Sequence, residues 1–220
     1  MLGILLSYLL GSLNGSLLLG RLSGVDIRTQ GSRNAGGTNA LRTQGLVFAF
    51  GVILIDVLKA WLAVRILPDL VEILGLNLGW FSPWSSRWLP VSCGFAAVIG
   101  HIYPVFHGFR GGKGVATLLG VLLALSPFLL FTLIAVWLLI MMIFGFVSLG
   151  SIVAAISLPF LVLFGWRAGL VLEANLVPWF IFSLACALLL FWTHRSNLLR
   201  IRNGTEPRAR RLWLLGRLLK

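Results

Sequence analysis

The chain has 220 residues, of which 59% are hydrophobic and only 11% are charged, and its formal net charge is +12. Because about a quarter of the residues of an ordinary soluble domain are charged, this composition excludes a typical water-soluble protein and indicates a membrane protein. The polar stretches between the apolar runs are too short to fold alone, so we expect a single domain over residues 1–220.

Apolar segments follow one another along the chain and predict an all-α fold, a polytopic integral membrane bundle of about seven transmembrane helices. The first segment has no basic region before it and no convincing cleavage site, so we interpret it as a span and not as a signal peptide. An irregular connection with the Trp-rich piece WFSPWSSRW is expected over residues 68–86. The segments cover residues 1–19, 46–66, 88–103, 115–125 (short for a full span), 128–146, 149–166 and 177–192.

Basic residues gather in three polar stretches, 20–45, 104–114 and 193–220, which alternate with the apolar segments so that all three fall on one side. The opposite loops hold few cations, offset by acids. Since basic loops stay in the cytoplasm, we expect these stretches and the C-terminus to be cytoplasmic and the N-terminus outside; five or seven spans both satisfy this. The cations of the opposite loops are Arg65, Arg87 and Arg167, and the acids are Asp69, Glu72 and Glu173.

The first polar stretch reads GRLSGVDIRTQGSRNAGGTNALRTQG and combines glycines, small polar side chains and arginines. Glycine lets successive backbone NH groups point at one anion, and arginine grips phosphate oxygens with paired donors. A solvated cytoplasmic loop is the alternative, but the density of small polar residues favours a phosphate site. Its candidate ligands are Gly31, Ser32, Asn34, Gly36, Gly37, Thr38 and Asn39, with Arg28, Arg33 and Arg42.

The second polar stretch belongs to the sequence GHIYPVFHGFRGGKGVAT, in which Lys113 is flanked by Gly111, Gly112 and Gly114. A glycine loop that leads into a helix N-terminus is typical of an anion site, while a flexible turn is the alternative. A Walker loop would need Gly at His107 and Ser or Thr at Gly114. The pattern therefore predicts phosphate binding without predicting ATP binding.

Two histidines end apolar segments at the same predicted surface: His101 before the second polar stretch and His194 before the tail. We expect both near the site, and we expect His107 to be structural. Asn197 and Arg200 follow His194 at helical spacing and should share its face. Residues 208–220 are interpreted as a basic amphipathic helix on anionic lipid.

Asp56 and Lys59 lie one helical turn apart inside an apolar segment, and we interpret them as a structural pair, with a role in orienting site residues as the alternative. Cys93 and Cys186 are expected to be small buried hydrophobic residues. The six acids form no cluster, so we predict no metal site. No histidine is followed five positions later by Asp, and no Gly-x-Ser-x-Gly motif occurs.

These motifs resemble those of the bacterial glycerol-3-phosphate acyltransferases of the PlsY type, which use acyl-phosphate as donor. The resemblance rests on Gly11-Ser12, Gly-Val-Asp-Ile-Arg, GSRNAGGTNALR, GHIYPVFHGFRGGKGVAT and HRSNLLRIRNGTE, in the family's order along nearly the whole chain. Four positions depart from the usual family pattern: Asn14 for Pro or a small residue, Arg33 for Gly, Gly37 for Ala, and Ala60 for Gly.

The resemblance implies transfer of an acyl chain from acyl-phosphate to the sn-1 hydroxyl of glycerol 3-phosphate, giving lysophosphatidic acid and phosphate. It implies a multi-pass enzyme of the bacterial inner membrane, without cofactor, metal or nucleic acid, with its site facing the cytoplasm. The expected partners are membrane lipid and, as a candidate, the peripheral enzyme that makes acyl-phosphate.

The residues divide into two groups by expected role. The catalytic group is Ser32, Arg42, Lys113, His194 and Asn197, and the binding group is Asn34, Gly36, Thr38, Asn39, His101, Arg110, Gly111, Gly112, Gly114 and Ser148. An organic-phosphate transporter is a rival hypothesis, but it predicts repeated halves with polar groups at mid-membrane. A non-catalytic lipid-binding scaffold would explain the tail but not the glycine loops.

Overall fold

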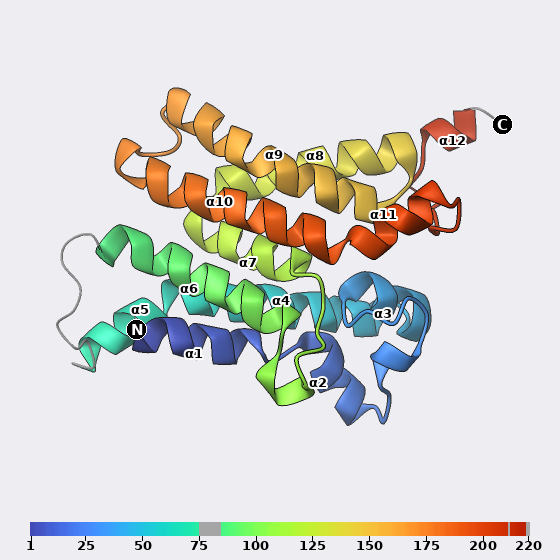
Figure 1. The fold of residues 1–220 in the computed structure, drawn as a ribbon, viewed down its shortest axis with the longest axis horizontal. Helices are drawn as coiled ribbons and strands as arrows, with labels where there is room; N and C mark the ends of the chain where they lie inside the picture. Colours follow the sequence, from blue (N-terminus) through green and yellow to red (C-terminus); the bar gives the residue numbers. More distant parts are fainter. Residues whose placement is uncertain (75–84, 211, 219–220) are drawn as a thin grey trace. The chain divides into compact units, whose positions relative to one another are not determined.

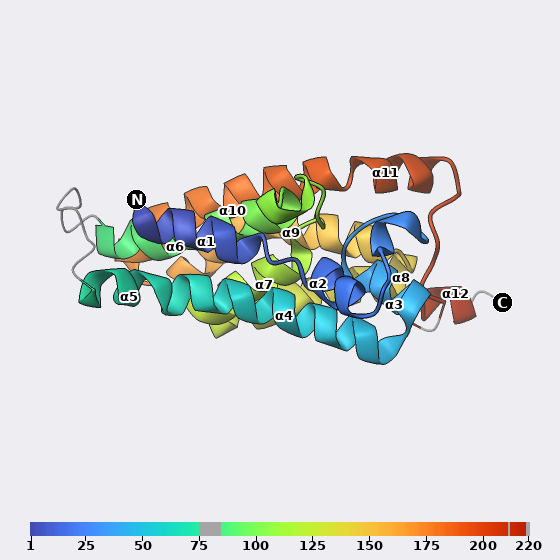
Figure 2. The ribbon, with the colours of Figure 1, turned by 90° about the horizontal axis from the view of Figure 1, so that it is seen from below.

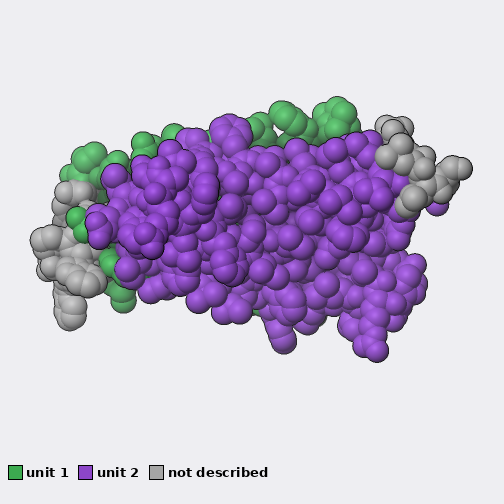
Figure 3. Space-filling view, turned by 90° about the horizontal axis from the view of Figure 1, so that it is seen from above, with its two compact units in different colours: residues 1–126 green, residues 127–220 purple. Residues whose placement is uncertain are grey.

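A computed structural model describes residues 1–74, 85–210 and 212–218, and it contains helices and no strand among them, as the sequence predicts. The chain divides into two compact units, Met1–Ser126 and Pro127–Lys220, which Figure 3 colours separately. Both predicted phosphate loops belong to unit 1, and the predicted tail motif belongs to unit 2.

In unit 1 the long helix α4 is central, and α7, α6 and α1 pack against it, while α1 also packs against α6 (Figures 1 and 2). Two short helices, α2 and α3, also pack on α4 and position the first polar stretch. The helices are α1 (Leu2–Gly11), α2 (Gly15–Leu22), α3 (Gly37–Gln44), α4 (Leu46–Arg65), α5 (Leu67–Ile73), α6 (Ser85–Ile102) and α7 (Val115–Leu125).

Small residues let these apolar helices approach closely. A Cβ on Gly11 of α1 would collide with the backbone of Ala97 on α6, and one on Gly100 would collide with the carbonyl oxygen of Tyr8. A Cβ on Gly120 of α7 would likewise collide with the carbonyl oxygen of Val57 on α4. Packing through small residues is typical of helices in lipid, where apolar burial itself supplies little attraction between helices.

The predicted first span over residues 1–19 is not one continuous helix: α1 and α2 meet at a bend of 49°. The reason is Asn14, whose side chain accepts hydrogen bonds from the NH groups of Ser16 and Leu17 and so caps a new helix. An asparagine inside an apolar run therefore ends one helix and begins the next, and α2 leads into the first polar stretch.

Unit 2 consists of three long helices, α8, α9 and α10, followed by the short helices α11 and α12. Helix α9 packs against both α8 and α10. Helix α11 begins directly after His194, which confirms the helical spacing predicted for the tail motif. The helices are α8 (Pro127–Phe144), α9 (Val147–Arg167), α10 (Glu173–Thr193), α11 (Arg195–Arg202) and α12 (Leu215–Leu218).

Among the described residues, five helices are long and apolar enough to cross a membrane, or six if the bent pair α1 and α2 forms one span. Helix α7 is apolar but has only 11 residues, with the bounds that the sequence predicts. The connection predicted as irregular over 68–86 is helical at both of its described ends, because α5 extends to Ile73 and α6 begins at Ser85. Most of its Trp-rich piece lies outside the described residues. Cys93 and Cys186 are buried and unbridged, as predicted.

Candidate functional site

Unit 1 brings the two predicted phosphate loops together. The guanidinium of Arg28 donates from Nη1 to the carbonyl oxygens of His107 (3.0 Å) and Arg110 (3.4 Å). Its Nη2 is ion-paired with Asp26 at 2.9 Å, and the hydrogen bond from Arg28 holds the pKa of that carboxyl below its usual range. One arginine of the first polar stretch thus ties that stretch to the second.

The first loop is shaped by Asn39, which is buried. Its Oδ1 accepts from the NH of Ser32 at 2.9 Å, and its Nδ2 donates to the carbonyls of Ile27 (3.1 Å) and Gln30 (3.0 Å). Both amide hydrogens are therefore engaged within the loop. Asn39, a predicted ligand, holds the loop in shape through these contacts.

Several of the remaining predicted ligands of this loop lie in sequence at the N-terminus of α3, while Arg42 lies in the last turn of that helix. Gly36 is the N-cap of α3, and no side chain caps that end of the helix. An uncapped helix N-terminus offers NH groups and the positive end of the helix dipole to an anion. Ser32, Thr38 and Arg42 are exposed, while Asn34 and Gly36 are half-buried.

The second loop folds back on the end of α6. The NH of Gly111 donates to the carbonyl of Ile102, and that of Gly112 donates to the carbonyl of His101, both at 3.1 Å. Gly114 is the N-cap of α7 with φ of +88°, a left-handed conformation that favours glycine, and again no side chain caps the helix. Lys113 is half-buried between these glycines, and Arg110 before them is exposed.

The second loop is also packed tightly against the first. A Cβ on Gly112 would collide with the imidazole Nε2 of His101, and it would lie 2.6 Å from the carbonyl oxygen of Ala35 in the first loop. Alanine at position 112 therefore cannot be accommodated without a shift of the loop. The glycines of this motif serve close approach between the two loops.

Beneath the loops lies a buried polar network. Asp56 and Lys59 form an ion pair at 2.8 Å and are nearly inaccessible, which confirms the predicted pairing. Lys59 Nζ also lies 3.0 Å from both the carbonyl oxygen of Leu13 and Nδ1 of His101. Asp56 Oδ1 accepts from the NH of Gly15 at 3.0 Å and lies 3.2 Å from the same Nδ1. The pair thus contacts a residue predicted for the site.

Asn14 connects this network to the first loop. Its Nδ2 donates to the carbonyl of Ala35 at 3.3 Å and lies 3.5 Å from Nδ1 of His101. The sequence alone marks Asn14 only as a departure from the family pattern. Its contacts show that this asparagine joins the bend between α1 and α2 to the site.

In unit 2, three predicted polar residues converge on one carboxylate, Glu206. Oε1 of Glu206 accepts from the hydroxyl of Ser148 and from Nδ2 of Asn197, both at 2.7 Å. Oε2 accepts from Nε of Arg200 at 2.7 Å. The sequence motifs assign no role to Glu206, although it is the one acid of the basic stretch 193–220, which is the signal that could have found it.

Replacing Glu206 with glutamine is expected to destabilise unit 2 by about 1.5–3 kcal/mol, the range for hydrogen bonds to a charged group. Burial raises the pKa of Glu206, but the hydrogen bonds from Asn197, Ser148 and Arg200 lower it more, so its pKa lies below the usual value of 4.5. The carboxylate therefore stabilises the fold above that usual value, and this stabilisation is lost as pH falls through the lower folded pKa.

Thermal unfolding of the purified protein at neutral and acidic pH measures this effect. The difference between wild type and Glu206→Gln should be full at neutral pH and shrink in acid. Glu173→Gln, at an exposed acid in the first turn of α10, is the matched control. Equal stability of Glu206→Gln and wild type at neutral pH would contradict the assignment.

His194 ends α10 and is buried, with its Nδ1 2.8 Å from the carbonyl oxygen of Leu190. A carbonyl oxygen only accepts, so Nδ1 carries the proton and a neutral ring has its lone pair on Nε2. The NH of Asn197 donates to the carbonyl of His194 at 2.8 Å, which fixes the start of α11.

The predicted site residues therefore form two sets, one within each unit: the two loops in unit 1, and Ser148, His194 and Asn197 in unit 2. Over the part of the chain that the structure describes, no three His, Cys, Asp or Glu side chains are arranged to hold a metal ion. The chemistry offered is that of cations, NH groups, amides and an imidazole.

Comparison with known proteins agrees with these motifs. The family described as "Glycerol-3-phosphate acyltransferase" matches residues 1–204. Proteins named glycerol-3-phosphate acyltransferase from Synechococcus elongatus and Geobacter sulfurreducens are similar. The first is 43% identical over 93% of this chain and 91% of its own, and the second is 40% identical over 92% and 93%.

Two crystal structures of PlsY (YgiH), an integral membrane glycerol 3-phosphate acyltransferase, are similar in fold. The glycerol 3-phosphate form has a TM-score of 0.77 and 36% identity and covers 94% of each chain. The lysophosphatidic acid form has a TM-score of 0.75 and 35% identity, over 94% of this chain and 93% of the other. With the apolar helices and the loop motifs, these matches show that the chain belongs to the glycerol-3-phosphate acyltransferase family of integral membrane enzymes.

Proposed function

We propose that the chain transfers an acyl group from acyl-phosphate to the sn-1 hydroxyl of glycerol 3-phosphate, releasing lysophosphatidic acid and inorganic phosphate. The observation that carries this proposal is the meeting of two glycine-rich loops in unit 1, tied by Arg28. Acyl-phosphate and glycerol 3-phosphate each carry a phosphate group, so a reaction between them would use two adjacent anion sites. The similar PlsY structures, solved in glycerol 3-phosphate and lysophosphatidic acid forms, support the acceptor and product.

In the proposed reaction the acceptor hydroxyl oxygen attacks the carbonyl carbon of acyl-phosphate. The new ester C–O bond forms, and the bond from that carbon to the phosphate oxygen breaks with its electron pair on phosphate. The leaving phosphate takes up the hydroxyl proton. Because acyl-phosphate is already activated, holding the two anions in contact supplies much of the rate.

We assign charge stabilisation to Arg42 and Lys113 and to the NH groups at the starts of α3 and α7. Fixed cations and NH groups stabilise the charge that develops on the leaving phosphate. The GGKG loop would hold glycerol 3-phosphate, with Gly111, Gly112 and Gly114 allowing its backbone to approach the ligand. Ser32 with Asn34 and Thr38 would contact the second phosphate.

For unit 2 we propose that His194 and Asn197 orient the reacting groups and that Ser148 assists through Glu206. These contacts are consistent with the hydrogen bonds that Ser148 and Asn197 make to one carboxylate. The imidazole of His194, with its lone pair on Nε2, is the alternative proton acceptor to the donor phosphate. His101, whose Nδ1 faces Lys59 and Asp56, is the other alternative.

We further propose that the whole chain acts as one acyltransferase domain with its site on the cytoplasmic face of the bacterial inner membrane. The family match over residues 1–204 runs through both units, which supports one domain. The concentration of arginine and lysine in the three polar stretches supports the orientation, with the N-terminus outside. A seventh span would require α7, and the peripheral enzyme that makes acyl-phosphate is the proposed partner at the basic surface.

The donor is tested with purified protein in lipid, labelled glycerol 3-phosphate, and either palmitoyl-phosphate or palmitoyl-CoA without added metal. Product is expected only with palmitoyl-phosphate. Lys113→Ala is expected to lower the rate by at least about 100-fold, the scale for removing one group that stabilises developing charge. Arg65→Ala, at an exposed cation at the far end of α4, is the matched control and should keep full activity.

Product from palmitoyl-CoA alone would overturn the proposed donor while leaving the family assignment intact. No product from either donor, with protein shown to be folded, would overturn the proposed function. Full activity of Lys113→Ala would exclude the GGKG loop from the reaction.

A further inference from the structure

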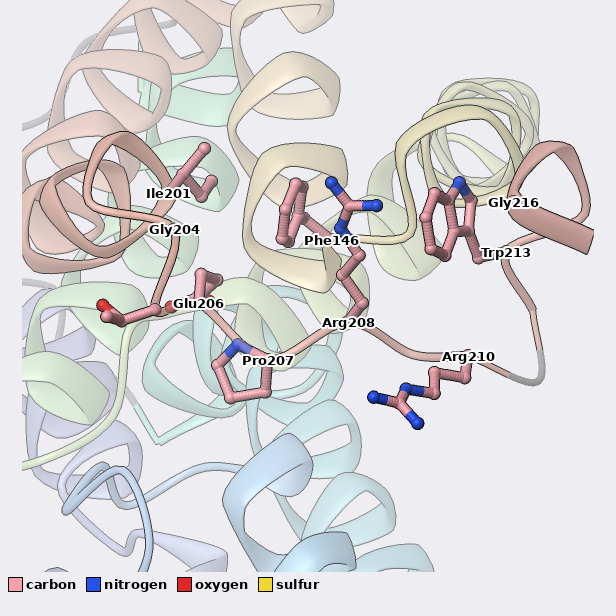
Figure 4. A pocket seen from close by; sticks show the side chains of 10 residues that line it. Phe146, Ile201, Gly204, Glu206, Pro207, Arg208, Arg210, Trp213 and Gly216 are labelled. Carbon is pink, nitrogen blue, oxygen red and sulfur yellow. The ribbon is translucent and has the colours of Figure 1, made fainter. Parts of the chain in front are cut away.

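The family match ends at residue 204, and residues beyond it line most of a pocket of about 1000 Å³ within unit 2 (Figure 4). Its lining includes Phe146 at the start of α9, Glu206, and from the tail Arg208, Arg210 and Trp213. Phe146, Arg208, Arg210 and Trp213 have no part in the proposed acyl transfer. Glu206 is connected to it only through its hydrogen bonds from Ser148 and Asn197. The proposed reaction therefore does not account for this pocket.

The tail is fixed at the junction between α8 and α9. The NH of Ala209 donates to the carbonyl of Gly145 at 2.8 Å, and Nε1 of Trp213 donates to the carbonyl of Ile143 at 3.0 Å. Gly145 lies against the Trp213 ring, which a Cβ there would approach to 2.8 Å. Helices α8 and α9 are both candidate spans, so their junction lies at a membrane surface and the pocket faces lipid headgroups.

Arg208 and Arg210 give the pocket positive charge. The guanidinium of Arg208 lies between two aromatic rings. Its Cζ is 4.8 Å from the ring centroid of Phe146 and 4.0 Å from the ring centroid of Trp213. Figure 4 shows Arg210 pointing away from both rings, and its side chain is exposed. Within the described part of the chain neither arginine has an ion pair, and the carboxylate of Glu206 is taken up by Ser148, Asn197 and Arg200.

Apolar side chains are exposed next to these cations. Leu212 is 48% exposed, and Leu214 and Leu215 are each 42% exposed. Arginine beside leucine and tryptophan at a membrane surface is typical of segments that insert into the boundary between headgroups and acyl chains. An occupant must therefore be anionic at the pocket and apolar beside it.

We infer that this tail pocket binds the phosphate headgroup of an anionic phospholipid of the surrounding bilayer. Arg208, held in place by its two rings, and Arg210 contact the phosphate, and the acyl chains remain in the membrane beside the exposed leucines. This lipid is neither donor nor acceptor in the proposed reaction. The bound lipid stabilises the conformation of the tail. Because Glu206 is part of the tail, the lipid also stabilises the hydrogen bonds from Ser148 and Asn197 to Glu206.

The test uses the full chain purified in detergent, to which phosphatidylglycerol or phosphatidylcholine is added. Native mass spectrometry then measures how many molecules of each lipid bind to the protein. Wild type is expected to prefer phosphatidylglycerol. Each basic residue near an anionic surface contributes about 1 kcal/mol, so Arg210→Gln should weaken phosphatidylglycerol binding about fivefold and Arg208→Gln with Arg210→Gln roughly 25-fold. Phosphatidylcholine binding should not change.

Arg167→Gln is the matched control, because Arg167 also covers a ring, that of Trp166 at 4.9 Å, but lies at the opposite end of α9. An equal loss in Arg167→Gln, or an unchanged preference in the double variant, would overturn the inference. Displacement of phosphatidylglycerol by excess inorganic phosphate would instead make this a free-phosphate site. Arg210→Gln removes a side chain packed against no ring, so its result stands even if the double variant fails to fold.

Discussion

Replacing Asp56 with alanine is expected to destabilise the protein by about 3–5 kcal/mol, because removing one partner of a buried ion pair leaves the other charge uncompensated. Lys59 would keep its contacts with the carbonyl of Leu13 and with His101 but lose its counter-ion, 2.8 Å away. The NH of Gly15 would also lose its acceptor. Thermal unfolding in detergent or lipid measures the loss.

Two variants separate the ion pair from other causes. Asp56→Ala combined with Lys59→Met removes both charges and should regain much of the stability, because no unpaired charge remains. Asp69→Ala, at an exposed acid in the first turn of α5, should unfold like wild type. A double variant no more stable than Asp56→Ala would show that the ion pair is not the source of the effect.

Replacing Gly112 with alanine is expected to lower acyl transfer by at least about 100-fold, the scale of a misplacement of about 1 Å in a reacting group. The new Cβ would collide with the His101 ring and approach the carbonyl of Ala35, so the second loop would have to move away from the first. Initial rates at varied glycerol 3-phosphate concentration measure the effect.

Gly108→Ala is the matched control within the same polar stretch. Gly108 has φ of +64°, and no atom lies within 4 Å of the place that a Cβ would take, so alanine there adds backbone strain of about 1 kcal/mol without a collision. Its rate should stay within a few-fold of wild type. Wild-type activity in Gly112→Ala would mean that the contact between the loops does not govern the reaction.

The helices were predictable where a long apolar run decides the structure. Helix α7 has the predicted bounds, and α4 and α9 differ from the prediction by a residue or two, since in lipid every backbone polar group must be paired within the helix. The break at Asn14 was not predictable from hydropathy. It depends on one side chain capping the next helix, and the surrounding residues remain apolar.

The site was predictable in its local parts only. Asp56 and Lys59 are three positions apart on one helix, so their pairing follows from spacing. The contact of Lys59 with His101 joins residues 42 positions apart, and that of Ser148 with Glu206 joins residues 58 apart, which no spacing rule gives. Such contacts depend on how helices pack, which a single sequence does not display.

At Arg33 the sequence differs from the usual family pattern, and the backbone conformation gives the physical meaning of this difference. The resemblance marked this position because the family usually has glycine there. The backbone of Arg33 has φ of +58°, in the left-handed region where a side chain costs about 1 kcal/mol or more. The family's glycine is thus explained by backbone conformation, and Arg33 occupies that conformation with its side chain exposed.

The spacing of Asp56 and Lys59 also bears on how the protein enters its membrane. An isolated charge at the centre of a span costs about 2.5–3.5 kcal/mol during insertion. Because the two charges are i and i+3 on α4, they can neutralise each other as soon as this helix forms, before any other helix arrives. Helix α4 can therefore be inserted as an electrically neutral segment, and Gly15 and His101 join the pair only when the other helices assemble around it.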